Sequence, residues 1–249
     1  SKSLPSRVRS PTPAKTEKPW CFLAMLLMFY QWGMVSLPWW YVLVALVVCT
    51  GIINAYNFMD GINGITGGYS LVVLGGLAYV NGWVVPFVDE KMIYTMMVAV
   101  LVFDGFNFRR KAKCFAGDVG AVSIAFVILF LLGRLILETG DWSYIIFLAV
   151  YGVDSVLTII HRLMLHENIG LPHRKHMYQL MANELKIPHV VVSSVYMVLQ
   201  LFIAAGLLWL PIDHWVYFFC VISCLMVIYV VLVKKYYPLH EAYLKQKKK

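Results

Sequence analysis

Long apolar runs separated by short polar segments dominate the sequence. A helix that crosses the hydrocarbon core of a bilayer needs about 20 mostly apolar residues. Six of the runs are uncharged, and two carry a single charge each, Arg134 and Asp154. Together they predict eight spanning helices, at Trp20–Leu37, Trp39–Met59, Thr66–Val88, Met92–Phe103, Val119–Leu137, Trp142–Ile160, Val190–Ile212 and His214–Val233. The run Met92–Phe103 is short and can span only if its helix continues through Phe106.

The basic residues gather at the two ends of the sequence and in two of the connections between these runs. Residues 1–19 contain five Lys and Arg, residues 107–118 contain four, residues 162–188 contain four and residues 234–249 contain six. These are 19 of the 21 basic residues, and only Lys91 and Arg134 lie elsewhere. Loops rich in Lys and Arg face the cytosol. The pattern therefore predicts that both ends of this sequence lie on the cytosolic side.

Composition supports a membrane protein. The 249 residues are 61% hydrophobic and 14% charged, whereas soluble globular proteins are about half apolar and a quarter charged. The net charge of +8 lies in loops and forms no stripe along one element, which argues against nucleic-acid binding. We expect an all-α, polytopic transmembrane helical bundle. It divides into a basic cytosolic segment (1–19), a single transmembrane domain (20–234) and a basic cytosolic tail (235–249).

The first cytosolic loop carries amides and a carboxylate at the end of an apolar run. If the helix continues through the segment, Asn54, Asn57 and Asp60 lie on one stripe at i, i+3 spacing. Four glycines follow that permit sharp turns or close backbone approach: Gly61, Gly64, Gly67 and Gly68. Polar groups at the end of a membrane helix are costly unless they are paired or used. A helix cap with a turn is the alternative interpretation of Asp60.

The second loop places four cations before an acid. The cations Arg109, Arg110, Lys111 and Lys113 suit phosphate oxygens. Asp118 would repel a phosphate unless a divalent cation lies between them, because carboxylates bind Mg2+ and Mg2+ binds diphosphate oxygens. The alternatives are that the cations only set topology and that Asp118 only caps a helix.

The third loop is rich in histidine and arginine. Its candidates are His161, Arg162, His166, His173, Arg174, Lys175, His176 and His189. No pair has the spacing of a zinc protease. The compact run Pro172–His176 favours an anionic substrate over a metal, although any single histidine can equally be a solvated loop residue.

Taken together, the three loops resemble the polyprenyl-phosphate N-acetylhexosamine-1-phosphate transferases of glycosyltransferase family 4. Residues 54–61 (NAYNFMDG) are similar to the family's Asn-x-x-Asn-x-x-Asp-Gly segment. Residues 112–120 (AKCFAGDVG) are similar to its Ala-Lys-x-Phe-x-Gly-Asp-x-Gly segment, and residues 172–177 (PHRKHM) to its histidine motif. The three motifs agree in order, spacing and membrane side.

The resemblance implies a Mg2+-dependent reaction, with Mn2+ as a substitute, that transfers a hexosamine 1-phosphate from a UDP-N-acetylhexosamine to polyprenyl phosphate and releases UMP. It implies catalytic roles for Asp118, Asp60 and His176, with Asp118 as the metal ligand. Phe115 would stack on the uracil. Further substrate contacts would come from Asn54, Asn57, Asn63, Lys113 and Arg174. The expected setting is the cytosolic face of a bacterial inner membrane, at the first membrane step of a cell-envelope polysaccharide such as the lipopolysaccharide O-antigen, with homodimerisation left open.

The motifs depart from the family pattern at several positions. Asn63 stands where many members have a second Asp, and Ala121, His173, Tyr178 and Gln179 are also unusual. These differences favour the sugar-transferase branch over the muramoyl-pentapeptide branch.

The family also has an adjacent Asp-Asp pair that this sequence lacks. In relatives the pair comes just before a segment similar to residues 3–9. We therefore expect this chain to be the C-terminal portion of a longer enzyme, without about three spanning helices. Alone, it would be inactive.

Two other functions remain open from the sequence. Asp154 and Arg134 lie within apolar runs, where charged residues often mark a transport pathway. A non-catalytic paralogue that only binds partners is the second alternative.

Overall fold

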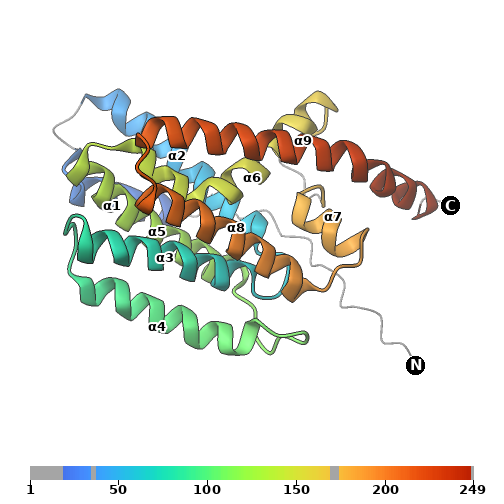
Figure 1. Cartoon of the computed structure of the whole chain (residues 1–249), viewed down its shortest axis with the longest axis horizontal. Helices are drawn as coiled ribbons and strands as arrows, with labels where there is room; N and C mark the ends of the chain where they lie inside the picture. Colours follow the sequence, from blue (N-terminus) through green and yellow to red (C-terminus); the bar gives the residue numbers. More distant parts are fainter. Residues whose placement is uncertain (1–18, 35–37, 169–173, 248–249) are drawn as a thin grey trace.

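The computed structural model describes residues 19–34, 38–168 and 174–247, and this part of the chain is helical without β-strands (Figure 1). Its elements are α1 (Pro19–Gln31), α2 (Trp39–Met59), α3 (Ile65–Trp83), α4 (Glu90–Asn107), α5 (Gly117–Thr139), the 3-10 helix η2 (Trp142–Leu148), α6 (Ala149–Met164), α7 (Met177–Asn183), α8 (His189–Trp209) and α9 (His214–Lys247). The predicted all-α bundle is confirmed.

Five helical segments of the described chain are long and apolar enough to cross a membrane. They are Trp39–Met59, Gly117–Thr139, Trp142–Met164, His189–Trp209 and His214–His240. The protein is therefore an all-α, polytopic membrane protein. Helices α1, α3 and α4 correspond to the other three predicted spans but are not among the five. Helix α1 has only 13 residues, and a bilayer core is about 30 Å thick. The count of eight spans stays a prediction.

The helix bounds follow the apolar runs closely. Helix α2 matches its predicted span residue for residue. Helix α4 continues past Phe106 to Asn107, as a span there requires. Helix α9 runs on to Lys247 with Pro238 inside it, so the predicted domain boundary at residue 234 falls within a helix.

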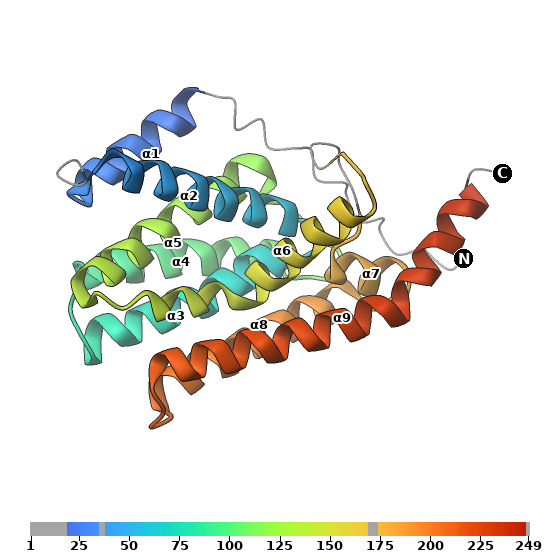
Figure 2. The ribbon, with the colours of Figure 1, turned by 90° about the horizontal axis from the view of Figure 1, so that it is seen from above.

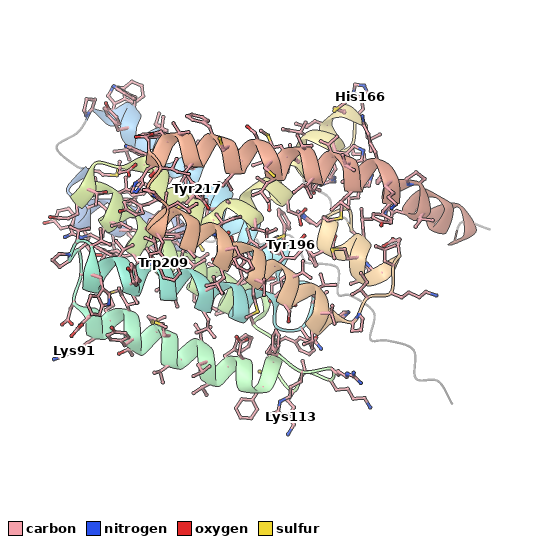
Figure 3. All side chains as sticks on the ribbon, viewed as in Figure 1. Lys91, Lys113, His166, Tyr196, Trp209 and Tyr217 are labelled. Atoms are coloured by element: carbon pink, nitrogen blue, oxygen red, sulfur yellow. The ribbon has the colours of Figure 1, made fainter. Side chains whose placement is uncertain are left out.

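The helices run side by side, and the motif loops meet at one end of the bundle. We call this the basic end and define it by residues 60–64, 108–116, 165–168 and 174–176. Lys113 and His166 lie there, whereas Lys91 lies at the opposite end (Figure 3). Seen from above, α1 and α2 lie on one side of the bundle and α8 and α9 on the other (Figure 2). The predicted grouping of the basic connections is therefore present in three dimensions.

Helix α3 occupies the centre of the bundle. It packs most extensively on α8 and α4 and also contacts α2, α5 and η2. Small residues allow this close approach: a Cβ at Gly68 would lie 2.4 Å from the sulfur of Met197. A helix that neighbours cover does not need an apolar surface toward lipid, so α3 can carry Ser70 and Asn81, both buried. This position explains why α3 is less apolar than the five spanning segments.

A buried glutamine supports the irregular backbone between η2 and α6. The side chain of Gln200 on α8 donates to the carbonyl of Ile146 at 3.0 Å and accepts from the amide of Val150 at 3.2 Å. Its carbonyl also accepts from the Tyr69 hydroxyl of α3 at 2.7 Å. A change from 3-10 to α geometry leaves backbone groups without helical partners, and the membrane interior offers no water. Gln200 supplies those partners.

An ion cluster anchors the segment between α6 and α7. Glu167 accepts from the guanidinium of Arg162 at 3.3 Å and from the ammonium of Lys175. Lys175 also donates to the hydroxyl of Tyr237 on α9 at 2.9 Å. Burial alone would raise the pKa of Glu167, but the hydrogen bonds and charges of Lys175 and Arg162 outweigh it and lower that pKa below its usual value. The cluster joins α6, the third loop and α9.

We predict that Gln200→Leu destabilises the protein. The variant removes the buried side-chain partner of the Val150 amide and of the Ile146 carbonyl and leaves the Tyr69 hydroxyl with its longer bond to the Phe147 carbonyl at 3.4 Å, which costs about 1–3 kcal/mol. Thermal unfolding in detergent measures the loss. Ser194→Ala is the matched control, because its hydroxyl bonds only to Val190 one turn back on the same helix. Equal melting temperatures for the two variants would contradict the role of Gln200.

We predict that Glu167→Gln lowers stability in a pH-dependent manner. Because the folded-state pKa of Glu167 is lowered, its contribution is fully present above the unfolded pKa of about 4.3 and is lost as the pH falls through the folded value. The loss at pH 7 is about 1 kcal/mol or less, since the side chain is 35% exposed. Melting temperatures from pH 7 to pH 3.5 test this, with Glu90→Gln at the opposite end as control. A difference that does not change with pH would be inconsistent with the ion pairs.

Candidate active site

The carboxylate of Asp60 joins the first two motif loops. Asp60 caps the C-terminus of α2, where its amide donates to the carbonyl of Asn57 at 3.3 Å. One carboxylate oxygen accepts from the hydroxyl of Thr66 on α3 at 2.8 Å, and the other accepts from the amide of Gly117 at 3.0 Å. Asp118 is the next residue, in the first turn of α5. The two predicted catalytic acids are therefore neighbours, although 58 positions separate them in the sequence.

Two asparagines brace the same loops. Asn107, at the end of α4, accepts from the amide of Gly64 at 2.6 Å and donates to the carbonyl of Cys114 at 2.7 Å. The amide of Asn63 donates to the carbonyl of Arg109 at 2.8 Å. Both side chains are buried. Asn63 thus positions the second motif loop, and its predicted contact with substrate stays a prediction.

Close approach of the loops depends on glycine at two positions. Gly64 has a φ of +80°, and a Cβ there would lie 2.0 Å from the ring of Phe108. A Cβ at Gly61 would lie 2.2 Å from the hydroxyl oxygen of Tyr178. The sequence predicts that these glycines let the backbone approach a ligand or turn sharply; in the structure protein side chains are the groups that approach them, and the approach of a ligand stays a prediction.

The third loop joins the first motif segment through a hydrogen bond and an aromatic contact. The Tyr178 hydroxyl of α7 donates to the carbonyl of Phe58 at 2.7 Å. The rings of Phe58 and His176 stack with centroids 6.3 Å apart. Burial, with the negative charges of Asp154 and Asp60, raises the pKa of Tyr178 well above its ordinary value. Tyr178 therefore stays protonated at neutral pH and keeps donating to the first loop.

His176 lies against a buried acid that sequence reasoning did not assign to the site. Its Nδ1 is 3.4 Å from a carboxylate oxygen of Asp154 on α6. Both side chains are almost fully buried, at 1% and 3% exposure. The sequence placed Asp154 within an apolar run, two helical turns before His161, and that position near the mouth of the helix was the available signal.

The remaining predicted residues divide between surface and interior. Lys113, Phe115 and Asp118 are exposed, Asn54 and Arg174 are half-buried, and Asn57 is buried. His173 lies outside the described residues. Exposed cations, an exposed aromatic ring and an acid therefore surround a buried polar scaffold at the basic end.

The acids of this end provide a limited set of metal ligands. Within the described ranges, no group of three or more His, Cys, Asp or Glu side chains is placed to hold a metal ion. Mg2+ typically takes one or two carboxylates, several waters and the phosphates of its substrate. Asp118 is exposed, and the amide before it is bonded to Asp60, so these two acids are the candidate carboxylates for such a site.

Comparison with known proteins agrees with the motifs. The profile of glycosyl transferase family 4 matches residues 17–136. Over 121 residues the chain is 32% identical to the phospho-N-acetylmuramoyl-pentapeptide-transferase of Thermotoga maritima, covering 49% of this chain and 38% of that protein. Over 167 residues it is 28% identical to the undecaprenyl-phosphate alpha-N-acetylglucosaminyl 1-phosphate transferase of Escherichia coli K12, covering 61% and 43%. The probable undecaprenyl-phosphate N-acetylglucosaminyl 1-phosphate transferase of Bacillus subtilis is 30% identical over 135 residues, covering 51% and 37%.

The chain spans less than half the length of each of these relatives. The profile match contains the first two motif loops, which Asp60 and Asn107 join in the structure. The motifs, the helical membrane fold and these matches agree, and over residues 17–136 the chain is similar to glycosyl transferase family 4.

Proposed function

We propose that this protein transfers an N-acetylhexosamine 1-phosphate from a UDP-sugar to a polyprenyl phosphate and releases UMP. The observation that carries the proposal is the meeting of the three motif loops at the basic end, through the bonds from Asp60 to Gly117 and from Tyr178 to Phe58. The Escherichia coli and Bacillus subtilis relatives are named for transfer of N-acetylglucosaminyl 1-phosphate with undecaprenyl phosphate. This proposal extends that chemistry to the present chain.

The reaction is a phosphoryl transfer. An oxygen of the lipid phosphate attacks the phosphorus next to the sugar, the bond from that phosphorus to UMP breaks, and UMP leaves with the bonding electron pair. Such transfers depend mainly on positioning and charge neutralisation. The exposed Lys113 and the cations before it would neutralise diphosphate oxygens, and the exposed ring of Phe115 would stack on uracil.

Mg2+ is part of the proposal. Asp118, with Asp60 beside it, would hold the ion, and the bound ion would supply further neutralisation of the diphosphate. Asp60 already accepts from Thr66 and Gly117, so its oxygens have a fixed direction. A pre-set carboxylate needs little reorganisation on binding.

The membrane setting follows from the two substrates. A polyprenyl phosphate keeps its chain in the bilayer, whereas a nucleotide sugar comes from water. The basic end satisfies both needs if it faces the cytosol, as the distribution of Lys and Arg indicates. We place the protein in a bacterial inner membrane, at the first membrane step of a cell-envelope polysaccharide.

The contacts of Asp154 favour this enzyme over a transporter. Its carboxylate accepts from the amide of Met177 at 3.0 Å and from the hydroxyl of Tyr196 at 2.7 Å, in addition to its contact with His176. An acid bound in this way supports a loop and does not line a path for ions.

We predict that the protein in its full natural form releases UMP when supplied with Mg2+, undecaprenyl phosphate and a UDP-N-acetylhexosamine. UDP-N-acetylglucosamine and UDP-N-acetylgalactosamine are the donors to test, in detergent, with UMP measured directly. Asp118→Asn removes the charge of the proposed ligand and should lower the rate about 100-fold or more.

Asp89→Asn is the matched control, because it changes an acid at the opposite end that caps α4, and asparagine caps helices equally well. Absence of UMP release with every such donor would overturn the proposed function. A normal rate for Asp118→Asn would remove Asp118 from the metal role.

We predict that Asp60→Asn weakens the link between the first two loops. The asparagine oxygen is uncharged, so it can accept from the Gly117 amide only in a weaker bond while its NH2 turns to the Thr66 hydroxyl, at a cost of about 1–2 kcal/mol. Amide hydrogen exchange at Gly117 should become faster, and UMP release should fall. Asp118→Asn should leave that exchange rate unchanged. Unaltered exchange at Gly117 in Asp60→Asn would show that the carboxylate does not hold the second loop.

A further inference from the structure

We propose that Asp154 is the positioning residue for His176, fixing the ring with its Nδ1–H toward the carboxylate so that Nε2 is the nitrogen that accepts a proton, which here is the proton of the lipid phosphate in its singly charged form. The inference rests on the proposed transfer for its catalytic consequence. The position and tautomer of the ring do not depend on that reaction and can be measured without substrate. Asp154 acts here through His176 and not on the substrate itself.

Asp154 is held by groups from three elements. The Tyr196 hydroxyl of α8 donates to one of its oxygens at 2.7 Å. The other oxygen accepts from the Met177 amide at the start of α7 at 3.0 Å and from Thr158, one turn further along α6, at 3.2 Å. A carboxylate fixed from several sides has one orientation, and it presents a fixed acceptor to the imidazole.

The Thr158 hydroxyl continues this network. It lies 2.7 Å from the hydroxyl of Tyr229 on α9. Helices α6, α7, α8 and α9 therefore all contribute to the position of the Asp154 carboxylate. Such a network is expected where an acid must keep one geometry in a medium of low dielectric constant.

His176 is positioned from its other side by the first motif loop. Its ring stacks on Phe58, which follows Asn57 in the Asn-x-x-Asn-x-x-Asp-Gly segment, and on Tyr178 with centroids 5.9 Å apart. The imidazole thus lies between the buried acid and the loop that carries Asp60. Its Nδ1 faces Asp154 at 3.4 Å, a length that is common for catalytic hydrogen bonds before substrate binds.

The chemistry of imidazole gives this contact a consequence. In a neutral ring one nitrogen carries the proton and the other the lone pair, and the partner of one nitrogen decides the state of the other. A carboxylate at Nδ1 keeps the proton there. Without it, a neutral imidazole prefers the Nε2–H form, in which Nε2 can no longer accept a proton.

A purely structural role for Asp154 makes a different prediction. If the carboxylate only capped the start of α7 through Met177, its loss would lower stability without selecting a tautomer. The test therefore measures the tautomer of His176 directly. It compares a variant that keeps a hydrogen-bond acceptor at position 154 with a variant that removes it.

The experiment uses the full natural protein labelled with 15N-histidine in detergent, without substrate. Two-bond 1H–15N correlation spectra report the tautomer, and His176→Gln identifies the signal. We expect Nδ1–H in the wild type and in Asp154→Asn, whose amide oxygen can still accept from Nδ1. We expect Nε2–H or a mixture in Asp154→Leu. Ser155→Ala, a buried neighbour on α6, is the control and should resemble the wild type.

The same variants are then assayed for UMP release. Asp154→Leu should lower kcat about 10- to 100-fold with little change in KM for the UDP-sugar, and Asp154→Asn should restore part of that loss. An Nε2–H tautomer in the wild type overturns the inference even if Asp154→Leu does not fold. An unchanged tautomer in a folded Asp154→Leu also overturns it. If the wild type releases no UMP but shows Nδ1–H that Asp154→Leu removes, the proposed function fails while the positioning role stands.

Discussion

The arrangement of the basic end depends on the carboxylate of Asp60. It lies at the end of an apolar helix, where an unpaired charge is costly, and it is paired with Thr66 and the Gly117 amide. These two bonds bring the starts of α3 and α5 to the end of α2. With these helix ends close together, Asn107 accepts from the Gly64 amide and the Tyr178 hydroxyl donates to the Phe58 carbonyl. Loss of the Asp60 contacts would leave Asn63 and Asn107 as the links between the first two loops.

The membrane imposes a second constraint, which separates the surface of the bundle from its interior. Helices that face lipid are apolar, and the central α3 instead carries glycines and polar groups that its neighbours satisfy. Gln200 shows how this works, because one side chain supplies the partners that η2 and α6 lack. A rigid interior of this kind can hold polar loops in fixed positions at one end, which a reaction dependent on positioning requires.

Most of the fold could be predicted from the sequence, since the apolar runs are long and the basic residues gather at the two ends of the sequence and in two of the connections. The grouping of Asp60, Asp118 and His176 could also be predicted, because three motifs in register limit the choices. The partners of these residues could not. Asn107, Thr66 and Asp154 are ordinary side chains in sequence, and their roles arise from contacts across 43, 6 and 23 positions. Asn63, which the motif predicts to contact substrate, also holds the backbone of the second motif loop, and that bond could not be predicted.

The role of the buried charge of Asp154 is determined by the residues that contact it. Within an apolar run it is compatible with a transport pathway, because that is where such acids often occur. In the folded chain Tyr196, Met177 and His176 surround its carboxylate, and little of it is exposed. Burying a charge without partners would cost several kcal/mol. A carboxylate with this many contacts holds the groups that contact it in place. The imidazole that faces it belongs to the third motif, so the support acts on the part of the molecule that the proposed chemistry uses.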